Sequence, residues 1–96
     1  MKETKQYRVE IIVKGLVQGV SFRVYTKRKA VSLGLTGQVR NLANGDVEVI
    51  AEGKQEQLGQ LIKWLRNKGS PASQVTDVTV NWSEELKNYT SFRVEF

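Results

Sequence analysis

The chain has 96 residues, of which 40% are hydrophobic and 26% charged, a composition that suits one small domain with a single core. It contains neither cysteine nor histidine, which excludes disulfide bonds, thiolate nucleophiles, phosphohistidine intermediates and the usual zinc sites. The net charge of +5 is consistent with an anionic partner and equally with a charge that only keeps the domain soluble.

The apolar residues occur in short groups, and no run approaches the roughly 18 residues needed to cross a bilayer. The N-terminal residues MKETKQYR also lack the hydrophobic region of a signal peptide. We therefore expect a cytoplasmic protein that does not associate with membranes. Residues 1–6 are expected to form a flexible tail and residues 7–96 a single domain, because no linker or repeat interrupts the pattern.

The first two predicted elements are a strand and a helix, separated by a segment with two glycines. Apolar and polar residues alternate over residues 7–13, which predicts a strand with one face toward the core. From residue 22 the apolar spacing becomes that of a helix, which Gly34 can terminate. The predicted buried face of this helix consists of Phe22, Tyr25, Thr26, Ala30 and Leu33.

A hairpin is predicted next. Two alternating segments, residues 38–42 and 47–51, flank Asn44-Gly45, a pair that readily takes the positive φ values of a tight turn. A second amphipathic helix then follows, with apolar residues at i, i+3, i+4 and i+7: Leu58, Leu61, Ile62 and Leu65.

Residues 76–82 and 92–96 alternate again and predict two final strands. The order βαββαβ with one additional C-terminal strand predicts an α+β, ferredoxin-like sandwich, with an antiparallel sheet and both helices on one face. In this topology the first two strands run parallel and the third lies antiparallel between them. The C-terminal ends of the first two strands then share one rim, which carries the loop of residues 15–20 and Asn41.

The loop at this rim has two interpretations. Gly15 and Gly19 allow a conformation in which backbone N–H groups point inward toward an anion, with the helix N-terminus contributing its own amides. A loop with two glycines, however, more often forms a simple tight turn. Arg23 in the first helical turn opposes the helix dipole, which a bound anion would offset, but it is otherwise a typical solvated arginine.

Two further polar residues are ambiguous in the same way. Ser21 has no histidine to activate it as a nucleophile, so we interpret its hydroxyl as part of the loop lining. Asn41 ends a strand before a hairpin, where a polar side chain commonly hydrogen-bonds its own turn.

The segment GLVQGVSFR, residues 15–23, resembles the acylphosphatase signature G-x-V-Q-G-V-x-F-R. Residues 34–48, GLTGQVRNLANGDVE, resemble the second block of that family, L-x-G-x-V-x-N-x-x-x-G-x-V-E. The two blocks have the spacing of the family, and the similar layout extends over residues 7–96. Asn44 stands where many relatives have aspartate, and Ser21 where glycine is frequent. We expect Asn44 to preserve the turn and Ser21 to stiffen the loop and change the rate.

The resemblance implies an enzyme that hydrolyses the carboxyl-phosphate bond of small acylphosphates to a carboxylate and inorganic phosphate, with no metal, cofactor or covalent intermediate. It implies that Asn41 and Arg23 are catalytic, with Asn41 positioning water and Arg23 binding phosphate. The implied phosphate-binding residues are Gly15, Gln18, Gly19, Val20, Ser21, Phe22 and Arg23. Inorganic phosphate or sulfate is expected to compete with substrate, and nothing in the sequence requires more than a monomer.

Two alternatives share the predicted fold. One is a domain that senses phosphate metabolites without catalysis. The other is an RNA-binding module, which is disfavoured because the sequence lacks the aromatic block typical of such domains. Tyr7, Phe92 and Phe96 are interpreted as core residues, so we expect no nucleic-acid partner.

Overall fold

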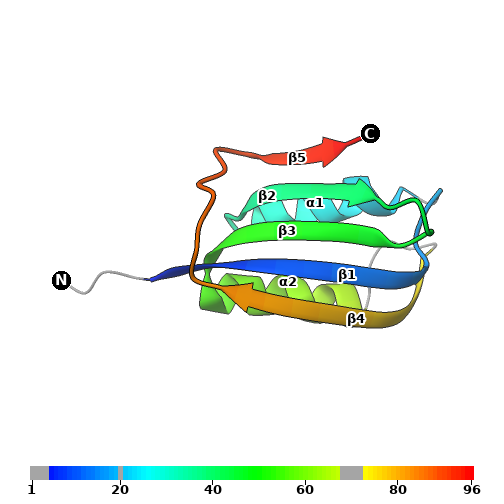
Figure 1. Cartoon of the computed structure of the whole chain (residues 1–96), viewed down its shortest axis with the longest axis horizontal. Helices are drawn as coiled ribbons and strands as arrows, with labels where there is room; N and C mark the ends of the chain where they lie inside the picture. Colours follow the sequence, from blue (N-terminus) through cyan, green and yellow to red (C-terminus); the bar gives the residue numbers. More distant parts are fainter. Residues whose placement is uncertain (1–4, 20, 68–72) are drawn as a thin grey trace.

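The computed structural model describes residues 5–19, 21–67 and 73–96. Figure 1 shows a single layer of strands with both helices against one of its faces. The elements in chain order are β1 (Gln6–Leu16), α1 (Phe22–Ser32), β2 (Thr36–Asn41), β3 (Val47–Lys54), α2 (Gln55–Asn67), β4 (Gln74–Ser83) and β5 (Phe92–Glu95).

The sheet has the strand order β4-β1-β3-β2-β5. Strand β1 pairs antiparallel with β3 and β4, and β2 pairs antiparallel with β3, so the predicted ferredoxin-like α+β fold is confirmed. The sheet is not wholly antiparallel, however, because β5 runs parallel to β2. The chain leaves β4 at one edge and crosses to the opposite edge at the end where β2 begins, so β5 starts beside β2 and follows its direction (Figure 1).

A buried carboxylate holds this crossing connection in place. Glu52 of β3 is only 3% exposed. Its two oxygens accept backbone N–H groups from Lys87 at 2.5 Å, Asn88 at 2.9 Å and Tyr89 at 3.4 Å. Because a buried charge must be satisfied by donors, these contacts stabilise the connection that leads into β5. The sequence pattern ended the predicted strand at residue 51 and gave no indication that Glu52 is buried.

The core lies between the sheet and the helices. Strands β1 and β3 present alternate residues to it, as the period of two predicts. Phe92 is buried and Tyr7 packs against the core, as expected, but Phe96 is 99% exposed and is not a core residue. The fully buried large side chains include Ile11, Phe22, Leu58, Leu61 and Leu65. Among the described residues, no helix has the length and apolar character needed to span a membrane.

The predicted shared rim is confirmed by the register of the strands. Val13 of β1 and Asn41 of β2 both lie opposite Val47, the first residue of β3, on its two sides. The segment that follows β1 and the hairpin that follows β2 therefore leave the same end of the sheet. This arrangement brings the two conspicuous sequence blocks together.

Candidate functional site

The loop at the rim is shorter than the sequence indicates, because β1 continues through Leu16. Gly15 pairs with Val75 of β4 at a register shift, and its φ is +130°. A Cβ atom on Gly15 would lie 2.1 Å from the carbonyl oxygen of Gln74. The close approach of β4 thus requires glycine here, independently of any ligand.

The loop itself runs from Val17 into the start of α1. Val17 is 1% exposed and anchors the loop in the core. Gly19 has φ +75°, and an added Cβ would meet no atom within 4 Å. Glycine is therefore favoured here by the positive φ and not by lack of room for a side chain. Val20 was also predicted to bind phosphate, but it lies outside the described residues.

Ser21 adopts a left-handed conformation, with φ 61° and ψ 21°, immediately before α1. Its side chain is exposed and makes no capping hydrogen bond to the helix. The first amides of α1 are consequently not occupied by a side-chain cap, and no acidic residue stands in the first turn. Such a helix start favours an external anion, since its N–H groups and dipole are uncompensated.

The side chain of Gln18 ties the loop to the hairpin. Its Nε2 donates to the carbonyl oxygen of Leu42 at 2.8 Å and to that of Asp46 at 2.7 Å. The same two carbonyls accept the backbone bonds that close the hairpin, from Gly45 and Leu42 respectively. Gln18 therefore fixes the distance between the glycine loop and the strand end at Asn41. Sequence reasoning gave Gln18 a role only through its backbone amide, because no local pattern announces a contact 24 positions away.

Arg23 and Asn41 line the same hollow, as the shared rim predicts. The hollow has a volume of ≈ 300 Å³. Its wall also contains the loop residues Gly19 and Ser21 and the first helical residue, Phe22. Two other predicted site residues, Gly15 and Gln18, do not line the hollow. Gly15 pairs with β4, and the side chain of Gln18 hydrogen-bonds the hairpin.

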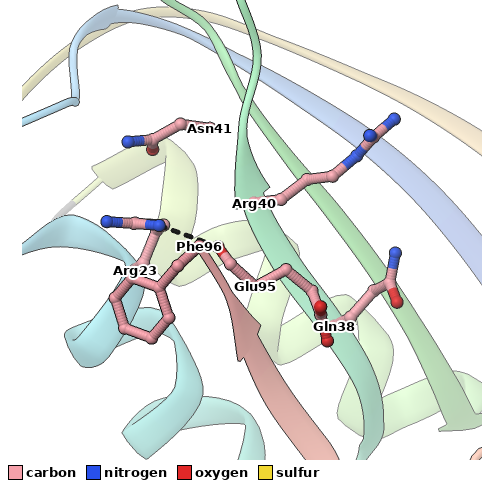
Figure 2. A pocket seen from close by; sticks show the side chains of 6 residues that line it. All are labelled: Arg23, Gln38, Arg40, Asn41, Glu95 and Phe96. Carbon is pink, nitrogen blue, oxygen red and sulfur yellow. Dashed lines mark hydrogen bonds between the residues drawn. The ribbon is translucent and has the colours of Figure 1, made fainter.

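Arg23 is half-buried rather than a solvated surface residue. Its Nη1 donates to the backbone carbonyl of Glu95 at 2.7 Å (Figure 2). The guanidinium carbon lies 4.7 Å from the centre of the Phe96 ring, a cation–π contact. The end of β5 thus orients Arg23 from one side. No local sequence pattern indicates this contact, because the partners are 72 positions apart.

Asn41 does not hydrogen-bond its own turn. Asn44 does so instead: its Oδ1 accepts the N–H of Asp46 at 3.0 Å, and its Nδ2 donates to the Asp46 carboxylate at 3.2 Å. Gly45 has φ +99°, whereas Asn44 stays outside the positive-φ region. The Oδ1 atom of Asn41 is shielded from solvent and has no hydrogen-bond partner within residues 5–19, 21–67 and 73–96. Arg8 Nε, Thr26 Oγ1 and Gln57 Oε1 are also buried without a partner among the described residues, but Asn41 is the one of these four residues that lines the hollow.

The side-chain charge at this site is positive. Arg23 is the ionised side chain in the wall of the hollow. In the part of the chain that the structure describes, no three carboxylates gather as they would around a metal ion. The arrangement offers backbone donors, one guanidinium and one free amide oxygen, a set suited to holding an anion and directing a water molecule toward it.

Comparison with known proteins settles the family. The acylphosphatase family profile matches residues 9–94. The chain belongs to the acylphosphatase family. An acylphosphatase of Caldivirga maquilingensis is 46% identical over 90 residues, which is 93% of this chain and 94% of that protein. The crystal structure of the Bacillus subtilis acylphosphatase superposes with a TM-score of 0.90 at 38% identity, covering 94% of this chain and 99% of that one. A Coxiella burnetii acylphosphatase structure gives 0.91 at 36% identity, covering 99% and 100%.

Membership of the acylphosphatase family confirms the resemblance stated from the two sequence blocks. The activity is that of an acylphosphatase, a hydrolase that acts on small acylphosphates. The comparisons do not favour the sensing or RNA-binding alternatives.

Proposed function

We propose that the hollow at the rim binds the phosphoryl group of an acylphosphate and that Asn41 directs the attacking water. The observation that carries this proposal is the unpaired Oδ1 of Asn41 in the same hollow as the Arg23 guanidinium and the start of α1. Arg23 and the backbone amides of residues 18–22 bind the phosphate oxygens. The part given to Val20 rests on the sequence motif alone.

The chemistry needs few side chains. The leaving group is a carboxylate, which is a stable anion at neutral pH, so no strong general acid has to protonate it. The water oxygen forms the new bond to phosphorus while the bond from phosphorus to the acyl oxygen breaks. Negative charge spreads over the equatorial phosphate oxygens, where fixed amides and the guanidinium stabilise it.

Asn41 orients the water by accepting one of its protons in a hydrogen bond. An amide oxygen is too weak a base to remove that proton, so the proton passes to an oxygen of the transferred phosphoryl group. The product leaves as inorganic phosphate together with the free carboxylate. Asn41 contributes position rather than basicity, which an aligned and otherwise unpaired acceptor can supply.

The contact with Glu95 engages Nη1 of Arg23 and leaves Nε and Nη2 for phosphate oxygens. Arginine suits this task because one edge of its planar guanidinium can bind the ligand while a nitrogen on another edge donates to a backbone carbonyl. We also propose that inorganic phosphate and sulfate compete with substrate, that catalysis needs no metal or other cofactor, and that the protein acts as a cytoplasmic monomer.

The test is hydrolysis of benzoyl phosphate by wild type and Arg23→Lys in excess EDTA, with inorganic phosphate as inhibitor. Wild type is expected to turn over with competitive inhibition. Arg23→Lys keeps the charge but loses the planar group, so kcat should fall by about 10²-fold or more and phosphate should bind more weakly. Arg28→Lys, an exposed arginine of the same helix, is the matched control and should behave as wild type. An active Arg23→Lys with unchanged phosphate inhibition would contradict the proposal.

A further inference from the structure

A second and larger cavity adjoins the hollow at Arg23 and Asn41. It has a volume of ≈ 520 Å³ and shares Arg23, Asn41 and Phe96 with the hollow. Its other wall contains Gln38, Arg40 and Glu95. Figure 2 shows Asn41 and Arg23 on one side of β2 and the side chains of Arg40 and Gln38 extending from the other. The cavity therefore extends past the end of β5 from one face of the sheet to the other.

The side chains that line this cavity are mostly polar. Two of its six lining residues are arginines, and one, Glu95, is a carboxylate that lies 3.5 Å from the Nε of Arg93. Of the six lining residues, only Phe96 has an apolar side chain. An apolar acyl group would gain little there, whereas an anionic group could pair with a guanidinium.

Arg40 can bind such a group directly. Its Nε contacts Oε1 of Glu48 at 2.7 Å, and half of its side-chain surface is exposed. The hydrogen bond and charge of Glu48 raise the pKa of the Arg40 guanidinium, so it stays ionised. Because the contact engages Nε, the outer edge formed by Nη1 and Nη2 remains to hold two oxygens of a ligand.

We propose that the acyl part of the substrate occupies this cavity and that Arg40 binds a second anionic group, a carboxylate or phosphate, at its far end. Arg40 is then a specificity-determining residue, selecting acylphosphates whose acyl part carries its own negative charge. The inference rests on the proposed placement of the phosphoryl group beside Arg23 and Asn41. Only a flexible acyl chain can follow the bend around β5 as far as Arg40, so a substrate with a rigid ring is hydrolysed without the Arg40 contact.

The test compares substrates that differ only in the far group. The monophosphate of adipic acid has a free far carboxylate, and the monophosphate of adipamic acid has an uncharged amide of the same size. The corresponding pair from glutaric acid, one carbon shorter, is assayed in parallel. The measured quantity is the ratio of kcat/KM for the charged and the uncharged member of each pair. In Arg40→Gln this ratio should fall about fivefold for at least one pair, with the uncharged substrate unaffected.

The matched control is Arg66→Gln, which removes the same charge from an exposed position on α2, outside the cavity lining. It should keep the wild-type ratio. The proposal is overturned if Arg40→Gln leaves both ratios unchanged, if it slows both members of a pair equally, or if Arg66→Gln lowers the ratio as much. Benzoyl phosphate separates this failure from failure of the proposed function: wild type that hydrolyses it normally keeps the proposed phosphate site even when Arg40 proves irrelevant.

Discussion

Two shielded polar side chains lie at opposite ends of the β2–β3 pair, and they differ in whether their hydrogen-bonding atoms have partners. Glu52, opposite Thr36, has both oxygens satisfied by three backbone N–H groups. Asn41, opposite Val47, has an Oδ1 atom with no partner in the described part of the chain. The satisfied group holds a connection together and contributes to stability. The unsatisfied group costs stability, and in the proposed function it accepts a hydrogen bond from the attacking water.

The largest effect is expected for Glu52→Gln. The amide keeps the shape of the side chain but turns an NH₂ group toward a backbone donor, so the free energy of unfolding should fall by about 2–3 kcal/mol. Urea unfolding monitored by circular dichroism measures the loss. Glu48→Gln, in the same strand and paired with Arg40 on a half-exposed surface, is the control and should cost under about 1 kcal/mol.

The folded Glu52→Gln protein should hydrolyse benzoyl phosphate at nearly the wild-type kcat, because Glu52 lies at the end of the sheet away from the hollow. Lost turnover in a fully folded variant would show that the two ends are not separate in function.

A smaller effect is expected for Gln18→Ala, which removes both hydrogen bonds between the loop and the hairpin. Asn41 and the glycine loop then lose their fixed separation, so kcat should fall by about tenfold while competitive inhibition by phosphate changes little. Gln18→Glu, which lacks the donors but keeps the size, should match Gln18→Ala. Wild-type kcat in both variants would mean that the hydrogen bonds of Gln18 do not position Asn41 relative to the glycine loop.

The smallest effect is expected for Ser21→Gly. Ser21 has φ 61°, a conformation that costs a residue with a Cβ about 1 kcal/mol and glycine almost nothing, so the variant should be about 0.5–1 kcal/mol more stable. Thermal unfolding reports this directly. Ser32→Gly, at the exposed C-terminal end of the same helix, should by contrast be destabilising. A destabilised Ser21→Gly protein would show that the serine makes a compensating contact.

The strands, both helices and the shared rim could be predicted because each follows from local patterning. The period of two over residues 7–13 and the change of period at Phe22 are properties of neighbouring residues, and the βαββαβ order then limits the topology to very few solutions. The ends of the elements were harder to predict. Strand β1 continues through Leu16 because Gly15 pairs with β4, a strand some sixty residues further along the chain.

The sequence motif singles out Arg23 and Asn41 as candidate site residues, and the register of the strands brings them to one hollow. The contacts that hold these residues in place could not be predicted. The carbonyl of Glu95 beneath Arg23, the Gln18 clamp and the burial of Glu52 all depend on contacts between distant segments, which leave no periodic signal. Phe96 was misassigned to the core for the same reason: alternation places it on a face but does not reveal that the sheet has ended there.

The central claim, that Asn41 positions water and does not bind phosphate or cap its turn, is tested most directly by Asn41→Ala. In this variant the kcat for benzoyl phosphate is expected to fall by about 10²-fold or more, with the inhibition constant of inorganic phosphate near its wild-type value and no loss of unfolding free energy. Circular dichroism on the same sample establishes that the protein is folded. Unchanged turnover in folded Asn41→Ala, or turnover lost together with phosphate binding, would contradict it.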